Sequence, residues 1–181
     1  MSKRSLGEDA TVGLRAGALL SLAAAVAWLT GAPAVFPSLG PSAFVLATDR
    51  PRPGDRVVIG GHAVGVAAGL VAYGVTVAVV PVPPAPLSFE PPWLVLSGIA
   101  AVALTSFGMR ATNLVHPPAC ATTLIVGLGL LEPRPAVLVL LPAVASLLVV
   151  DRALDALIVI TLTVYRRAPS PSTALGDKKR E

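Results

Sequence analysis

Long uninterrupted runs of apolar residues alternate with short, polar and Pro-rich connections along this chain. Four of these runs come close to or exceed the roughly 20 residues that a helix needs to cross the hydrocarbon core of a bilayer. They extend approximately over Leu14–Gly31, Val57–Val80, Trp93–Met109 and Ala136–Tyr165. The pattern predicts an all-α membrane protein, a helix bundle with four long spans.

Two shorter apolar pieces lie between these spans, over 43–48 with a lead-in from residue 34, and over 119–131. Prolines stand at the start of each piece: Pro33, Pro37 and Pro41 in the first, Pro117 and Pro118 in the second. Proline fits the first turn of a helix, whereas the residue before it is pushed into extended geometry. Each piece is therefore predicted to be an extended lead-in followed by a short helix. A helix over 118–131 would be about 21 Å long, too short for the core of about 30 Å.

Basic residues indicate whether the short pieces cross the membrane, because cytoplasmic connections are enriched in Lys and Arg. If both pieces cross, the chain makes six passes with both termini in the cytoplasm, and only Arg134 lies outside. The cytoplasmic set would then be Lys3, Arg4, Arg15, Arg50, Arg52, Arg56, Arg110, Arg166, Arg167, Lys178, Lys179 and Arg180. Re-entrant pieces would move the basic residues of 50–56 and Arg110 outside. Crossing is favoured, with Arg152 inside a span and an external connection over 81–92.

Six passes give the domain organisation. We expect a cytoplasmic tail over 1–13, a single transmembrane domain over 14–165, and a basic, disordered cytoplasmic tail over 166–181. Halves over 14–80 and 93–165 would each have three passes, so the second would be inverted relative to the first, a recurring design of transporters. The first apolar run imitates a cleaved signal peptide, but Glu8 and Asp9 interrupt its basic region, so we expect it to be retained.

Composition agrees with the membrane class. The chain is 54% hydrophobic and only 13% charged, against about a quarter charged residues in soluble proteins. Aromatic residues make up 4%, too few for the girdles of a β-barrel or for a surface that stacks on bases. Topology already explains the net charge of +4, so we expect a lipid bilayer and no nucleic acid as partner. A bundle this small could also need a second copy to enclose a pathway.

Cysteine and histidine are scarce. Cys120 is the single cysteine, which excludes an intrachain disulfide and a cysteine-based metal cage. His62 and His116 are the only histidines and lie far apart in the sequence. We therefore expect no metal and no other cofactor.

The segment 113–123 carries the strongest candidate chemistry. Asn113 and His116 are polar at membrane depth, where irregular backbone must line a cavity or be buried in protein. The helix that follows Pro117 and Pro118 is expected to leave unpaired N–H groups and a partial positive charge at its start, beside small Ala119 and within reach of Thr122. An anion suits such a site. The alternative is that His116 only caps its own helix.

The segment 36–43 offers similar chemistry. Gly40 permits a turn, and Ser38 and Ser42 place hydroxyls near a second helix N-terminus. An anion held between two helix N-termini would need no metal. The alternative is a plain turn at the membrane interface.

Two further features of the sequence fit either a functional role or a structural one. His62 stands beside Gly61, Gly65 and Gly69, whose i, i+4, i+8 spacing suits close helix contact, so this histidine is either a pathway residue or a structural hydrogen bonder. Asp151 and Asp155 face the same way on the last helix. They are functional if buried, or surface groups if the helix leaves the membrane near 151 and continues along the interface.

The order of these motifs resembles the HPP family of integral membrane proteins, named for His-Pro-Pro. The resemblance rests on Asn-Leu-Val-His-Pro-Pro-Ala-Cys-Ala-Thr at 113–122, Pro-Ser-Leu-Gly-Pro-Ser-Ala at 37–43 and Gly-Gly-His at 60–62, and it covers about 14–152. It implies a fold usually described with four spans, and some chloroplast and cyanobacterial members are linked to nitrite transport. This chain differs in having Cys120 where the family tends to have Gly, and in its apolar extension after Asp151.

The function expected is transport of a small inorganic anion such as nitrite. Its candidate binding residues are Asn113, His116, Pro117, Pro118, Ala119, Thr122, Ser38, Gly40, Ser42 and His62. An enzyme using His116 with Asp151 or Asp155 is disfavoured, because no nucleophile, base and orienting group share a recognisable spacing. A structural or regulatory membrane subunit is the remaining alternative. The expected location is a prokaryotic plasma membrane.

Overall fold

The computed structural model describes residues 6–80 and 93–167, and every regular element in those ranges is a helix. The elements are α1 Leu6–Thr30, α2 Val35–Thr48, α3 Asp55–Val79, α4 Trp93–Thr112, α5 Ala119–Gly127, α6 Pro133–Leu138 and α7 Leu140–Arg167. This confirms the predicted all-α bundle. The predicted connection over 81–92, residues 1–5 and most of the predicted C-terminal tail lie outside the described residues.

Four stretches are long and apolar enough to cross a membrane, as predicted. They are Asp9–Thr30, Asp55–Val79, Trp93–Thr112 and Pro133–Tyr165. Two details differ from the sequence prediction. Helix α1 begins at Leu6, within the predicted tail, and the last stretch is interrupted at Val139, between α6 and α7.

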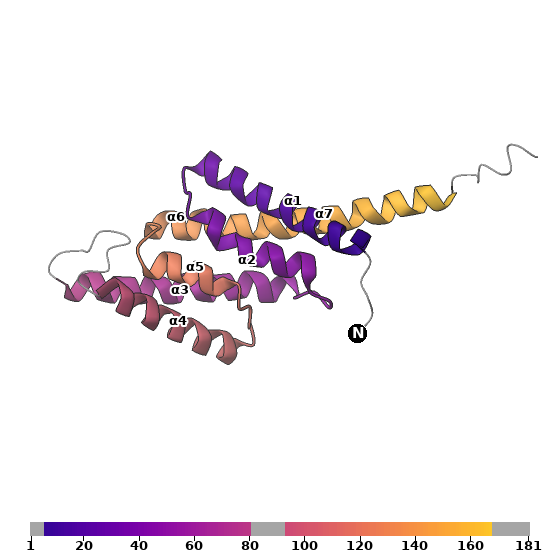
Figure 1. Cartoon of the computed structure of the whole chain (residues 1–181). Coiled ribbons are helices and arrows are strands. Elements are labelled where there is room, and N and C mark those ends of the chain that lie inside the picture. Colours follow the sequence, from indigo (N-terminus) through magenta and orange to yellow (C-terminus); the bar gives the residue numbers. More distant parts are fainter. Residues whose placement is uncertain (1–5, 81–92, 168–181) are drawn as a thin grey trace, which may run out of the picture.

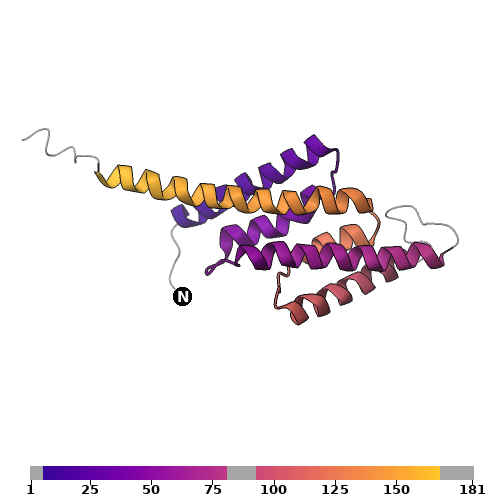
Figure 2. The ribbon, with the colours of Figure 1, turned by 180° about the vertical axis from the view of Figure 1, so that it is seen from behind.

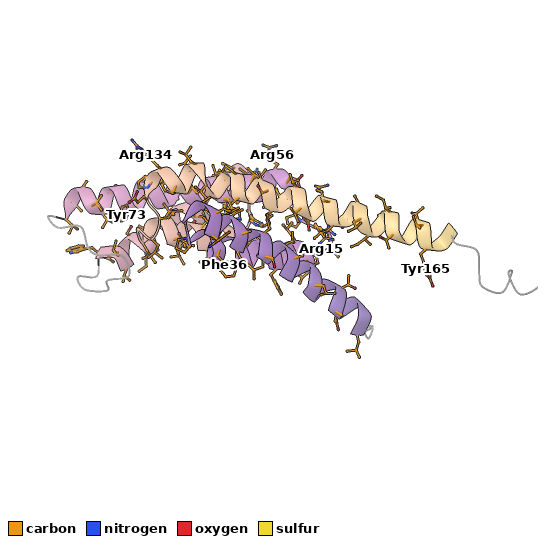
Figure 3. All side chains as sticks on the ribbon, turned by 90° about the horizontal axis from the view of Figure 1, so that it is seen from above. Arg15, Phe36, Arg56, Tyr73, Arg134 and Tyr165 are labelled. Atoms are coloured by element: carbon orange, nitrogen blue, oxygen red, sulfur yellow. The ribbon has the colours of Figure 1, made fainter. Side chains whose placement is uncertain are left out.

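The helices lie side by side, and from α1 to α5 each runs opposite to the one before it (Figures 1 and 2). Helices α2 and α5 are short, with 14 and 9 residues, and each lies along only part of α3 (Figure 1), so the crossing of these segments and the inverted repeat both stay predictions. We call the end at which α3 begins the charged end, because Arg15, Arg52, Arg56 and Asp151 lie there. Figure 3 shows Arg134 and Tyr73 toward the other end and Arg15 and Arg56 nearer the charged end.

Small residues let α3 and α5 pack closely. A Cβ added at Gly61 would lie 2.6 Å from His116 Cβ, and one at Gly65 would lie 2.7 Å from Thr123 Oγ1. At Gly69 the same atom would meet the side chain of Val126 at 2.8 Å. The predicted stripe of small residues is therefore confirmed as a close helix contact.

Helix α2 corrects the prediction for the first Pro-rich piece. It begins at Val35 and continues through Pro37 and Pro41, so the expected extended lead-in and the turn at Gly40 are wrong. Pro37 falls in the first turn, where a missing N–H costs little. Pro41 forfeits one helical hydrogen bond, which a helix surrounded by other helices tolerates.

Helix α5 follows the prediction at its start and departs from it at its end. Residues 114–116 are not helical, and the helix begins directly after Pro118, as expected. It stops at Gly127 and not near 131, because Gly129 adopts a φ of +69° and the Leu130 N–H bonds the Ile125 carbonyl at 2.9 Å. This is the left-handed glycine motif that ends helices.

Apolar side chains fill the interior and also cover much of the outside. The largest fully buried apolar side chains come from α1, α2, α3, α4, α5 and α7: Leu19, Leu39, Leu46, Leu94, Leu140, Leu147, Val35, Val58, Val126 and Val144. Trp28, Ile99 and Phe107 are among the large apolar side chains exposed on the outer faces. An outer surface of this kind is favourable against lipid and unfavourable against water.

The end of α7 leaves the bundle. Beyond Asp155 the helix continues straight past the other helices (Figure 1), and Leu157, Val159 and Ile160 are exposed. The expected continuation over 156–165 is therefore an unbroken extension of α7.

Candidate functional site

Five buried side chains form a continuous hydrogen-bonded chain where α2, α3 and the start of α5 meet. Ser38 Oγ lies 2.6 Å from Thr122 Oγ1, which lies 2.7 Å from His62 Nδ1. The other ring nitrogen, His62 Nε2, lies 2.9 Å from Ser42 Oγ, and Ser42 Oγ lies 3.0 Å from His116 Nε2. All five residues are at most 1% exposed. We call this set the hydroxyl–imidazole chain.

Local structure places each member. Ser38 and Ser42 are four residues apart on α2 and so share one face of that helix. His62 lies two turns into α3, beside the glycine stripe that admits α5. His116 ends the extended segment before α5, and Thr122 lies in the first turn of that helix. The chain therefore draws on three separate parts of the sequence.

Every member of the chain can both donate and accept a hydrogen bond. A hydroxyl has one donor and two acceptor positions, and a neutral imidazole has one N–H and one acceptor nitrogen. Both nitrogens of His62 are used, whereas Nδ1 of His116 is outside the chain. The two imidazole centroids are 5.5 Å apart and tilted by 53°, so Ser42 and not ring stacking connects them.

A pocket of about 280 Å³ lies at the charged end, where the chain reaches His116. Its lining residues are Val45, Asp49, Pro51, Arg52, Pro53, Val115, His116, Pro117 and Pro118. It contains one positive and one negative side chain, Arg52 and Asp49. A small polar solute in this pocket would lie next to one end of the hydroxyl–imidazole chain.

Arg52 also belongs to a cluster of four charges. Arg15 Nε donates to Asp151 Oδ1 at 2.9 Å, and Arg15 Nη1 donates to Asp155 Oδ1 at 2.7 Å. Arg52 Nη2 donates to Asp155 Oδ1 at 2.8 Å, and its Nη1 lies 3.2 Å from Asp151 Oδ2. The formal charges cancel, and the cluster joins α1, the connection from α2 to α3, and α7. Asp151 is 2% exposed, so the interpretation of both acids as surface groups is wrong for this residue.

Arg152 takes no part in the cluster. It points to another side of α7 and donates to Asp55 Oδ1 at 2.7 Å, and both side chains are exposed. Exposed ion pairs contribute little to stability because water competes for both groups.

Three of the other predicted binding residues adjoin the chain. Pro117 and Pro118 line the pocket, and buried Ala119 donates its N–H to the His116 carbonyl at 3.0 Å. Gly40 is not part of the site, because the nearest atom to a Cβ built there is Leu20 Cδ1 on α1, at 3.8 Å.

Asn113 also lies outside the site. It is exposed and has a φ of +56°, and the N–H of Leu114 bonds the carbonyl of Met109 at 2.9 Å. Asparagine tolerates this left-handed conformation, so Asn113 ends α4.

The prediction of unpaired N–H groups at the start of α5 is wrong. Ala119, Cys120 and Ala121 donate their N–H groups to the carbonyls three residues before, at 3.0, 3.0 and 3.1 Å. At the start of α2, Val35 and Phe36 do the same at 3.0 and 3.2 Å. Tight turns ahead of each helix have already satisfied the groups that an anion would need.

Helices α2 and α5 are antiparallel, and their first turns contact each other. Ser38 in the first turn of α2 contacts Thr122 in the first turn of α5, while Ser42 farther along α2 contacts His116 ahead of α5. An anion between the two helix N-termini stays a prediction. The interhelical polar groups are the side chains of the hydroxyl–imidazole chain.

Sequence reasoning did not identify Arg15 and Arg52 as site residues, since both were used only as topology markers. The sequence did contain an indication: Arg15 lies inside one predicted span, and the oppositely charged Asp151 and Asp155 lie inside another, where they could pair with it. Among residues 6–80 and 93–167, no three His, Cys, Asp or Glu side chains are grouped so as to hold a metal ion.

Comparison with known proteins gives one match. A family model described as HPP, transmembrane region, matches residues 2–169. No curated protein and no solved structure matches the chain.

Proposed function

This chain belongs to the HPP family of integral membrane proteins, and from that premise we propose that it transports a small inorganic anion such as nitrite. One observation carries the proposal: a hydrogen-bonded polar chain runs through the core of an apolar bundle and ends at a pocket containing Arg52 and His116. The anion is expected to cross the membrane without being chemically altered.

Burial of this many polar side chains in a membrane bundle favours a functional role. Polar groups at membrane depth are costly and are retained mainly where they line pathways or bind ligands. Hydrogen bonds between helices can also serve packing alone. The pocket at His116 favours a pathway, because packing does not require the last imidazole to adjoin an open space.

The groups at the pocket suit weak binding of an anion. The guanidinium of Arg52 can form charge-assisted hydrogen bonds with an oxyanion, and the imidazole of His116 can donate one more. Asp49 and the acids paired with Arg52 reduce the net attraction. A transported ion must bind well enough to enter and weakly enough to leave. The pocket would accommodate nitrite with several waters, since each water occupies about 30 Å³ in the liquid.

Passage requires a rearrangement, because the hydroxyl–imidazole chain is packed shut between α2, α3 and α5. Movement of one group of helices against another around a fixed site is a common transport mechanism. We place the charged end, with the pocket, in the cytoplasm of a prokaryotic cell, because four arginines lie at that end: Arg50 and Arg52 in the connection from α2 to α3, Arg56 in the first turn of α3 and Arg110 in the last turn of α4.

The test is nitrite uptake into liposomes that contain the purified protein, with nitrate, formate and chloride as competitors. His116→Ala should remove at least about 90% of saturable uptake, because it deletes the imidazole at the pocket. Ser97→Ala is the matched control, since Ser97 is also buried but donates to the Gly127 carbonyl, away from the chain. If the folded protein shows no uptake above empty liposomes, nitrite is not its substrate, and a structural or regulatory role gains weight.

A further inference from the structure

The hydroxyl–imidazole chain can be hydrogen-bonded in two opposite directions. In the first, Ser38 donates to Thr122, Thr122 to Nδ1 of His62, Nε2 of His62 to Ser42, and Ser42 to Nε2 of His116. In the second, every one of these bonds is reversed. Both directions need only neutral imidazoles with one N–H each, and all four links lie between 2.6 and 3.0 Å. We propose that this chain conducts protons, and that the proton is the ion coupled to anion transport.

The two directions differ by one proton moved along each link. Starting from the second, a proton from water in the pocket binds Nδ1 of His116, and Nε2 of His116 passes its proton to Ser42. Each later group gives up one N–H or O–H proton and gains another, until Ser38 releases a proton to water arriving from the opposite end. One proton enters, one leaves, and every side chain ends neutral. Histidine relays of this kind occur in membrane pumps and transporters.

Close packing favours a proton over a larger ion. A methyl group at Gly61 would lie 2.6 Å from His116 Cβ, and one at Gly65 would lie 2.7 Å from Thr123 Oγ1. A sodium ion would need several oxygen ligands and space for its own volume, whereas a proton moves along existing hydrogen bonds. The chain offers three hydroxyls and two imidazoles, and no carboxylate makes a hydrogen bond with it in the described residues.

The charged and titratable groups around the chain lie at its pocket end. Asp49 and Arg52, from the connection between α2 and α3, line the pocket with His116, and His62 of α3 faces His116 across Ser42. On α5, Cys120 is half-buried. Helix α4 contributes the Thr105 hydroxyl, which contacts Thr123 beside the chain. Asp49 is therefore the carboxylate that shares the pocket with His116.

The inference rests on the proposed function, and it specifies how transport is energised. A single chain transfers one proton per reversal, so nitrite and one proton would move together without net charge. Uptake should therefore follow a pH gradient and be insensitive to an imposed membrane potential. A proton-independent carrier of the free anion would show the opposite dependence.

Thr122 provides a matched pair of variants. Thr122→Val has nearly the same shape but lacks the hydroxyl that joins Ser38 to His62, so it should break the chain and still fold. Thr122→Ser keeps the hydroxyl and loses a methyl group. Ser97→Ala removes a buried hydroxyl outside the chain. Each protein would be placed in liposomes with an internal pH dye, and proton and nitrite uptake would be recorded together under a pH gradient or a potassium diffusion potential.

The expected result is one proton per nitrite, driven by the pH gradient. A positioned proton-transfer group is worth about 10²–10⁴-fold in rate, so Thr122→Val should slow coupled uptake at least about tenfold, and Thr122→Ser should recover most of it. Nitrite uptake without proton movement, or unchanged coupling in Thr122→Val, would overturn the inference and leave the proposed function standing. Proton flux that Thr122→Val removes, in the absence of nitrite uptake, would support the pathway and reject nitrite transport. Neither flux from the folded protein would overturn both.

Discussion

Arg52 Nη2 donates a hydrogen bond to Asp155 Oδ1 at 2.8 Å, and Arg52 also lines the pocket beside His116. One side chain therefore ties the wall of the pocket to α7. Because Asp155 also accepts from Arg15 on α1, a shift of α1 against α7 would change the position of Arg52 at the pocket. The charge cluster links helix arrangement to the site at which we propose the anion binds.

Replacing Arg52 tests its place in the pocket. Arg52→Gln removes the positive charge that a bound anion would face, and a hydrogen bond to a charged group contributes about 1.5–3 kcal/mol. The nitrite concentration at half-maximal uptake should therefore rise about tenfold or more. Arg152→Gln, which removes an exposed guanidinium outside the pocket, should leave that concentration unchanged. Equal effects of the two variants would show that only the overall surface charge matters.

The charge cluster should be important for stability through its buried members. Asp151→Asn removes one of the two carboxylates that pair with the buried guanidinium of Arg15 and leaves it only Asp155, so we expect a loss smaller than the roughly 3–5 kcal/mol of a buried charge left with no partner. Thermal unfolding of the purified protein in detergent should show a clearly lowered midpoint. Asp55→Asn, at the exposed ion pair with Arg152, is the matched control and should barely change the midpoint. A similar midpoint for the two variants would mean that Arg15 finds water instead of depending on Asp151.

Helix contact between α3 and α5 depends on the glycine stripe. In Gly65→Ala the new Cβ would lie 2.7 Å from Thr123 Oγ1 and 3.0 Å from the Ala119 carbonyl oxygen, so the helices must separate. Overpacking of this kind costs about 1–3 kcal/mol. Gly74→Ala on the same helix meets nothing within 4 Å and should stabilise by about 0.5–1 kcal/mol. The midpoints of thermal unfolding should thus move in opposite directions, and parallel changes would contradict the observed packing.

Variants of Asn113 test whether this residue only ends α4 or also contributes to anion binding. Its φ of +56° is open to glycine and strained for alanine, so Asn113→Gly should be tolerated and Asn113→Ala should cost about 1 kcal/mol. Neither variant should alter half-saturation for nitrite, because this exposed side chain lies outside the hydroxyl–imidazole chain. If Asn113→Gly lost most of its nitrite uptake while its thermal unfolding midpoint stayed unchanged, Asn113 would belong to the binding site.

Where the sequence prediction failed, non-local contacts decided the outcome. Pro41 indicates a break by local rules, yet α2 continues through it because the helix is enclosed by α1, α5 and α7. The motif 113–122 was identified as the centre of the site, but the unpaired N–H groups expected at the start of α5 were wrong. Turns formed by residues 116–118 occupy the N–H groups that were expected to bind an anion.

By itself, the sequence determined the membrane class, the long helices, the start of α5 after Pro118, the close-contact stripe on α3, and the shared face of Asp151 and Asp155. These follow from apolar run length, proline geometry and helical periodicity, which act within a few turns. Only the tertiary structure decided that Ser42 lies between His62 and His116, and that Arg15 pairs with Asp151, 136 residues away. A helical pattern shows which side chains share a face but not which helix that face meets. That choice depends on how all the helices pack together and satisfy one another's buried polar groups.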